Sequence, residues 1–186
     1  MPRAGLDPAV VVAAAAELAD EAGLGNVTMG SLAERLGVRA PSLYKHVDGQ
    51  ADLTRRIATL ALTELGDALR DALQGRAGPD ALSAAAQTFR TYAIEHPGRY
   101  AATVRVTSVQ PGDPLADAGT RVFESLAAVL RGYRIEQADT IHALRMLRSL
   151  LHGFATLEAS EVFQLGTDID ESFTWLVGFV DRGLST

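Results

Sequence analysis

The stretch that decides the fold lies near the N-terminus and reads VTMGSLAERLGVRAPSLYKHV from Val27 to Val47. Thr28 can cap a first short helix that ends at Gly37, and Pro41 suits the first turn of a second helix over residues 40–46. Apolar side chains recur where two crossing helices would meet: Leu32, Leu36, Val38, Leu43 and Val47. The pattern predicts a helix-turn-helix, whose second helix enters the major groove of DNA.

The second helix of this motif would expose side chains that suit a DNA groove: Arg39, Pro41, Ser42, Tyr44, Lys45 and His46. Arginine can bond guanine, proline and the serine carbon can touch a thymine methyl, and tyrosine, lysine and histidine can bond phosphate. The alternative is a solvated helix face, which is the usual meaning of a charge cluster. The helix-turn-helix context favours DNA contact.

The net charge of −6 argues against a nucleic-acid partner, because DNA binding neutralises phosphates with basic side chains. The charge is unevenly distributed, however. Residues 28–47 contain three basic residues and one acidic residue, whereas residues 57–186 contain eleven basic and sixteen acidic residues. The local field of the motif is therefore compatible with DNA.

Helical spacing of apolar residues continues through the rest of the chain and predicts an all-α fold. Helices are expected over residues 8–22, 29–36, 40–46, 50–73, 80–95, 100–107, 115–131 and 136–163, and after a capping box at 167–170. Loops are expected at 74–79 and 111–114, where Gly and Pro gather. Residues 1–49 would form the DNA-binding domain, and residues 50–186 a larger helical domain for effector binding and dimerisation.

The last two predicted helices are apolar on more than one face, so they must be covered on nearly all sides. The same pair from a second copy would cover them in a two-fold, four-helix interface. Its expected residues are Leu147, Leu151, Phe154, Phe173, Trp175, Leu176, Phe179 and Val180. The alternative is that other helices of the same chain bury both faces.

The N-terminal third resembles the TetR family of repressors over about residues 7–57. The resemblance is carried by Ala16-Glu-Leu18 through Gly23, Val27-Thr-Met29, Leu32-Ala-x-x-Leu-Gly-Val38 and above all Ser42-Leu-Tyr-Lys-His-Val47. It implies phosphate contacts for Thr28 and Tyr44, and base-facing or groove-edge positions for Arg39, Ala40, Pro41 and Lys45. Gln50, close to Asp48, stands where the family usually has lysine, which weakens the case for one phosphate contact.

The C-terminal part resembles the WHG-type TetR C-terminal domain at Leu151-His-Gly-Phe-Ala-Thr-Leu-Glu158, without the tryptophan of that pattern. The resemblance implies an effector pocket among the helices after the DNA-binding domain, for a small apolar or aromatic molecule. The candidate lining residues are Phe89, Tyr92, Tyr100, Arg105, Phe123, Met146 and His152. The alternatives are plain core packing for the aromatic residues and pairing of Arg105 with an acidic neighbour such as Glu124.

Other function classes lack their signatures. The chain has no cysteine, which excludes disulfides and thiolate sites, and its histidines have no metal-ligand spacing. Nucleophile elbows, phosphate loops and dinucleotide fingerprints are absent, so we expect no enzyme activity, metal or cofactor. No apolar run is long enough to cross a membrane, and the first residues lack a signal-peptide pattern, so we expect a cytoplasmic protein.

These observations predict a DNA-binding transcription regulator, and specifically a homodimeric repressor released from a near-palindromic operator in double-stranded DNA by a small molecule. Two alternatives stay open at this point. One is a DNA-binding dimer without an effector. The other is an all-helical carrier or enzyme whose N-terminal domain only resembles a DNA reader.

Overall fold

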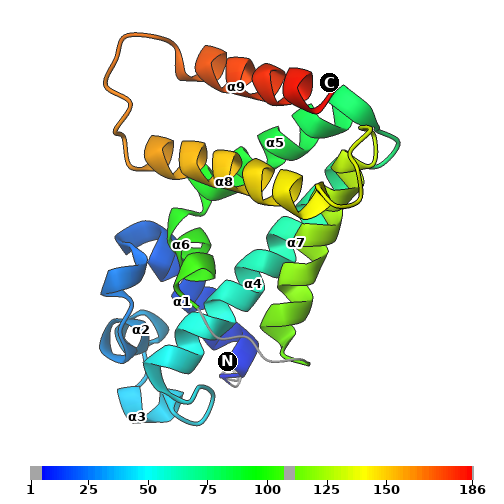
Figure 1. The fold of residues 1–186 in the computed structure, drawn as a ribbon. Helices are drawn as coiled ribbons and strands as arrows, with labels where there is room; N and C mark the ends of the chain where they lie inside the picture. Colours follow the sequence, from blue (N-terminus) through cyan, green and yellow to red (C-terminus); the bar gives the residue numbers. More distant parts are fainter. Residues whose placement is uncertain (1–5, 107–111, 186) are drawn as a thin grey trace. The chain divides into compact units, whose positions relative to one another are not determined.

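In the computed structural model, which describes residues 6–106 and 112–185, every regular element is a helix (Figure 1). The elements are α1 (Pro8–Ala22), the 3-10 turn η1 (Leu24–Asn26), α2 (Met29–Leu36), α3 (Ala40–Leu43), α4 (Gly49–Ala72), α5 (Gly78–Glu95), α6 (Pro97–Arg105), α7 (Pro114–Leu130), α8 (Thr140–Ala159) and α9 (Ile169–Leu184). The predicted all-α fold is confirmed. In the described part of the chain, no helix is long and apolar enough to cross a membrane.

The chain packs as two compact units. The N-terminal unit comprises residues 1–62 and 96–118, and the C-terminal unit comprises residues 63–95 and 119–186. Packing therefore does not divide the chain by a single cut after residue 49, because α6 packs on α1 and η1 and joins the N-terminal unit. The functional boundary at residue 49 stays a prediction.

Local capping explains why the first helices begin and end where they do. The Asp7 side chain accepts a hydrogen bond from the Val10 amide at 2.8 Å, and Pro8 opens α1. Thr28 and Ser31 form a reciprocal capping box at the start of α2, and Gly37 ends α2 in the left-handed conformation, with φ +64°. Residues of this type satisfy the unpaired backbone groups at helix ends. The predicted bounds of α2, residues 29–36, are confirmed.

Several predicted helix bounds were wrong. The helix expected over 40–46 ends at Leu43, because the His46 amide bonds the Leu43 carbonyl three residues back and tightens the chain into a turn. The helix expected over 100–107 begins at Pro97, whose fixed φ suits a first helical turn. Residue 107, its expected end, lies outside the described residues, as does the start of the loop at 111–114.

The last two helices also differ from expectation. The helix expected over 136–163 is the shorter α8, whose end is followed by Glu161 in a left-handed conformation at φ +54°. The expected capping box at 167–170 is replaced by a cap one residue later. There the Asp168 side chain accepts a hydrogen bond from the Glu171 amide at 3.0 Å. Aspartate is the better cap because its carboxylate also favours the positive end of the helix.

The N-terminal unit has a continuous apolar core that includes Leu32, Leu43, Leu53 and Ile57, each fully buried. The start of α6 lies against the end of α1 so closely that a Cβ atom on Gly98 would lie 1.8 Å from the Ala19 carbonyl oxygen. Polar bonds hold the same junction: the backbone and side chain of Arg99 donate to Asp20 at 2.8 and 2.7 Å. These contacts fix α6 within the unit that contains the helix-turn-helix.

The C-terminal unit contains a buried cation. Arg90 on α5 is 6% exposed, donates to Glu158 of α8 at 2.7 and 2.5 Å, and forms an ion pair with Asp170 of α9 at 2.7 Å. Its guanidinium also lies 4.7 Å from the ring centre of Phe173. A buried charge needs such partners, and the hydrogen bond that Arg90 donates to Glu158 raises the pKa of Arg90 above its ordinary value. This cluster joins α5, α8 and α9.

Candidate nucleic-acid interface

Two buried side chains anchor the recognition segment, the stretch from Arg39 to Val47. Leu43 is fully buried and Val47 is 2% exposed, and both belong to the core of the N-terminal unit. The turn from α2 is closed by the Val38 amide, which bonds the Ala33 carbonyl at 3.0 Å. The two anchors fix one side of the segment, while Tyr44 and Lys45 between them and Arg39 and Pro41 before them are exposed.

The predicted DNA-contacting residues lie together around α2, α3 and the turn after α3. Arg39, Pro41 and Lys45 are exposed, and Tyr44 is 57% exposed. Thr28 is exposed at the start of α2. The remaining three predicted residues, Ala40, Ser42 and His46, are half-buried. The exposed members can reach a ligand without any change in the core, and the half-buried ones can do so only at a close approach.

The basic residues of the motif differ in whether acidic side chains of the protein already bind them. Arg35 on α2 is held by α1, through bonds of 3.1 Å to Glu17 and 2.6 Å to Glu21. The hydrogen bond from Arg35 lowers the pKa of the Glu21 carboxyl. Within the described residues, neither Arg39 nor Lys45 makes an ion pair. Arg39 and Lys45 are therefore the cations of this surface that can meet phosphates or base edges.

The start of α4 is tied to the motif by a bond that the sequence analysis missed. The Gln50 side-chain amide donates to the Val27 carbonyl at 2.8 Å, and the Asp52 carboxylate accepts from the Asp48 amide at 2.9 Å. No local sequence signal indicates the Gln50 bond, because its two residues lie 23 positions apart. Gln50 therefore bonds to the protein itself at the position where the TetR family usually has a lysine.

The seven predicted effector residues are divided between the two units of the chain. Tyr100 and Arg105 lie on α6 in the N-terminal unit, where Tyr100 is buried and Arg105 is exposed. The other five lie in the C-terminal unit: Phe89 and Tyr92 are buried, Phe123 and Met146 are exposed, and His152 is half-buried. Tyr92 is also committed to a hydrogen bond with Glu64 at 2.7 Å. That these residues line an effector pocket stays a prediction.

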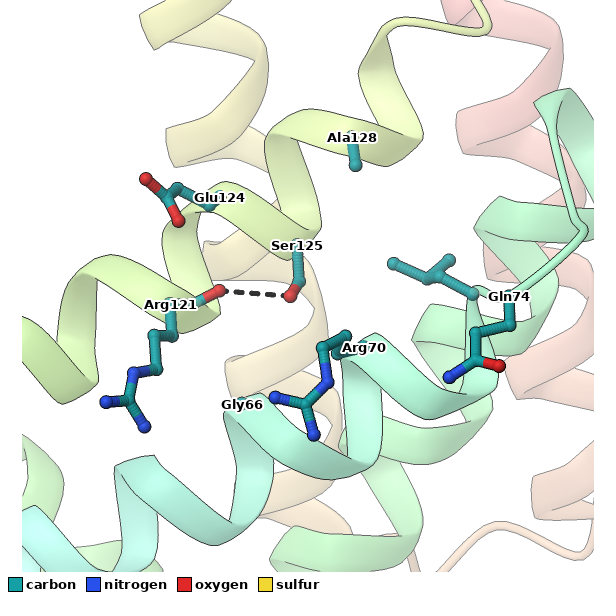
Figure 2. A pocket seen from close by; sticks show the side chains of 8 residues that line it. Gly66, Arg70, Gln74, Arg121, Glu124, Ser125 and Ala128 are labelled. Carbon is teal, nitrogen blue, oxygen red and sulfur yellow. Dashed lines mark hydrogen bonds between the residues drawn. The ribbon is translucent and has the colours of Figure 1, made fainter.

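A groove of about 310 Å³ lies in the C-terminal unit between α4 and α7 (Figure 2). Its walls are formed by Gly66, Arg70, Leu73, Gln74, Arg121, Glu124, Ser125 and Ala128, and none of them belongs to the predicted effector set. Arg70 is paired with Asp67 at 3.0 Å, and the Ser125 hydroxyl donates to the Arg121 carbonyl at 3.0 Å. The groove is open and mixed in polarity, so its chemistry indicates no particular ligand.

The predicted interface residues divide into two groups. Leu147, Leu151, Phe173 and Val180 are buried within the chain itself and belong to its own core. Phe154 and Leu176 are half-buried. Trp175 and Phe179 are 66% and 56% exposed and stack with ring centres 5.6 Å apart. The sequence pattern identified apolar helices correctly but did not separate the face that the chain covers from the face that it leaves open.

Two family models match the sequence. The model described as bacterial regulatory proteins of the tetR family matches residues 11–57, and the tetracyclin repressor-like C-terminal domain matches residues 82–180. An HTH-type transcriptional regulator of Bacillus subtilis, YobS, is 36% identical over 183 residues, which cover 98% of this chain and 95% of that protein.

Solved structures share the fold. BioQ, crystallised with its natural double-stranded DNA operator, has a TM-score of 0.73 at 22% identity and covers 98% of this chain and 99% of its own. A TetR variant from Acinetobacter baumannii AYE in complex with minocycline has a TM-score of 0.71 at 24% identity and covers 96% of both chains. The two family models and the relative from Bacillus show that the chain belongs to the TetR family of DNA-binding transcriptional regulators.

Proposed function

We propose that the protein is a homodimeric repressor that binds a near-palindromic operator through its α2–α3 motif and leaves it when a small molecule binds. The observation that carries the proposal is the pairing of two buried anchors, Leu43 and Val47, with the exposed side chains of Arg39, Tyr44 and Lys45. A regulator of this family has no need of a catalytic site, and we propose no enzymatic role.

In the proposed complex, each subunit reads one half-site. Arg39 lies at the start of α3 and reads a base edge, while Lys45, Tyr44 and Thr28 bond phosphates on either side of the groove. Pro41 gives an apolar contact for a thymine methyl group. The two recognition segments of a dimer would enter successive major grooves, about 34–36 Å apart. BioQ was crystallised with an operator, which supports DNA binding by this fold.

The proposed dimer surface consists of the exposed apolar side chains of α8 and α9. These are Ile141, Met146, Leu157, Trp175 and Phe179, which are 40% to 66% exposed. The stacked pair Trp175 and Phe179 would form its centre, since large aromatic side chains contribute most to interface energy. A second copy presents the same surface, so a two-fold axis would bury both sets together.

We propose that an apolar or aromatic effector acts on the C-terminal unit, where Phe89, Tyr92 and His152 remain the candidate contacts. The minocycline complex of a structural neighbour supports ligand binding by this fold. The effector would shift the dimer toward a spacing that does not fit the operator, by no more than its difference in affinity for the two states. A rise in melting temperature with a compound that also weakens operator binding would separate this proposal from an effector-independent regulator.

The DNA-binding part of the proposal is tested with fragmented genomic DNA from the source organism. The purified protein is incubated with the fragments at about 150 mM salt and an excess of random-sequence competitor. We expect particular fragments to be retained more tightly than the competitor. Equal retention of all fragments would reject the proposal and favour a helical carrier or enzyme, whose activity an Arg39→Ala change would leave intact.

A further inference from the structure

Gln50 connects the start of α4 to Val27, the residue that precedes the cap of α2. The Gln50 Nε2 atom donates to the Val27 carbonyl at 2.8 Å in a partly buried bond. Val27 itself is 2% exposed, so its backbone is held in the core of the N-terminal unit. The bond therefore fixes a carbonyl group directly before Thr28, the residue that caps α2.

The peptide group between Val27 and Thr28 is held at both of its polar ends. Its carbonyl oxygen accepts from Gln50, and its N–H, which belongs to Thr28, donates to the Ser31 hydroxyl at 2.9 Å. Because a peptide group is planar, two such bonds fix its rotation. The Thr28 hydroxyl, which accepts from the Ser31 amide at 3.0 Å, is thereby given one orientation at the exposed start of α2.

The charges around Gln50 argue against a direct phosphate contact from the same side chain. Asp48 and Asp52 lie on either side of it in sequence, and Asp52 is directed to the start of α4 by its bonds to the Asp48 amide and to Arg56. Carboxylates repel phosphate, and the neutral glutamine amide does not compensate for them.

We propose that Gln50 is a positioning residue for DNA binding: it holds the peptide before Thr28 so that the Thr28 hydroxyl and the start of α2 meet a phosphate without reordering. This inference rests on the proposed function and adds how the protein orients the Thr28 hydroxyl for its phosphate contact. It also explains how a chain with glutamine at the start of α4 retains an ordered phosphate-binding edge without a lysine there.

The test is a double-mutant cycle between Gln50→Met and Thr28→Ala, measured as affinity for an operator recovered from the protein's own binding selection. Methionine keeps the length and lack of charge of Gln50 but removes its donor. We expect Gln50→Met to weaken binding by about tenfold for a dimer that carries it in both half-sites. In the Thr28→Ala background the same change should cost less than about twofold. In a Thr28→Ser background, which keeps the hydroxyl, Gln50→Met should again weaken binding by about tenfold.

The control is Gln87→Met on α5, which also loses one side-chain hydrogen bond, to Thr91 at 3.3 Å, and should leave affinity unchanged. Additive losses in the cycle would overturn the proposal, because they would mean that Gln50 contacts DNA independently. The absence of any loss would overturn it as well.

Hydrogen exchange of the Thr28 amide in the free protein provides a readout that does not depend on DNA. We expect faster exchange in Gln50→Met than in the parent, whereas equal rates would show that the bond does not hold the peptide. If the parent protein binds no specific DNA while exchange still accelerates, the proposed function fails and the structural role of Gln50 stands.

Discussion

Within five residues, the recognition segment changes between buried and exposed side chains. Leu43 and Val47 are buried, while Tyr44 and Lys45 between them are exposed. This alternation separates the residues that hold the segment from those that can meet DNA. A substitution at an anchor should act through stability, and a substitution at an exposed position should act through binding.

Arg39 and Lys45 should therefore have different effects when changed to alanine. Arg39→Ala should relax the preference at one base position per half-site, at a cost of about 1–3 kcal/mol for the preferred base. Lys45→Ala should weaken all sequences alike and reduce the slope of log affinity against log salt by about one per half-site. Titrations of matched operators at several salt concentrations measure both effects.

The control for this pair is Arg76→Ala, which removes an exposed charge from the loop before α5. It should change neither base preference nor the salt slope. If Arg39→Ala lowered the affinity for all sequences equally and left the base preference unchanged, the base-reading role of Arg39 would be contradicted.

His152 makes stability depend on pH. Burial lowers its pKa below the ordinary value of 6.5, and the charge of Arg148 adds to the lowering. The folded state thus favours the neutral ring, so the unfolded chain binds the proton more readily as the pH falls through 6.5. The contribution of the neutral His152 ring to stability is fully present above pH 6.5 and is lost as the pH falls below it. Melting temperatures from pH 7.5 to 5.5 should fall less steeply in His152→Gln than in the parent, while the exposed His142→Gln on the same helix should behave as the parent.

At the scale of the helices, the sequence predicts best where the signal is local. The bounds of α2 could be predicted because Thr28 and Gly37 act on their own backbone neighbourhood. The end of α3 and the cap of α9 were misplaced by one to three residues, since several nearby residues could serve. The buried Arg90 pair could not be predicted at all, because its partner Glu158 lies 68 positions away and only folding brings the two together.

Close approach of α1 and α6 gives a prediction at this scale. Gly98→Ala should lower the free energy of unfolding by about 1–3 kcal/mol or more, because the added Cβ would overlap the Ala19 carbonyl. Gly30→Ala is the matched change in α2, where the nearest atom to an added Cβ is Thr28 Oγ1 at 3.6 Å. It should raise stability by about 1 kcal/mol through higher helix propensity. Urea unfolding of both variants checks the pair, and equal effects would contradict the close contact.

At the scale of the whole molecule, the sequence indicated the family and the fold class but not which apolar surfaces the chain keeps for itself. Helical periodicity shows that α8 and α9 are apolar on several faces, yet it contains no information on what packs against each face. Leu147, Leu151, Phe173 and Val180 are in the chain's own core, whereas Trp175 and Phe179 remain exposed. The same limit applies to α6, whose packing into the N-terminal unit depends on contacts distant in sequence.

The exposed aromatic pair supports a prediction about assembly. Trp175→Ser should convert the proposed dimer to a monomer in sedimentation experiments and lower operator affinity, because one half-site alone binds weakly. Val10→Ser, which alters another exposed apolar residue, on α1, should leave the dimer intact. A Trp175→Ser variant that stays dimeric would place the interface elsewhere.

The most direct test of the central claim is a selection of bound fragments from a random duplex pool at about 150 mM salt, with the retained fragments sequenced. We predict a two-fold symmetric motif whose half-site centres lie about one helical turn, or a multiple of it, apart. Arg39→Ala should blur one position in each half. Recovery of fragments without a shared motif would contradict sequence-specific DNA reading by the α2–α3 segment.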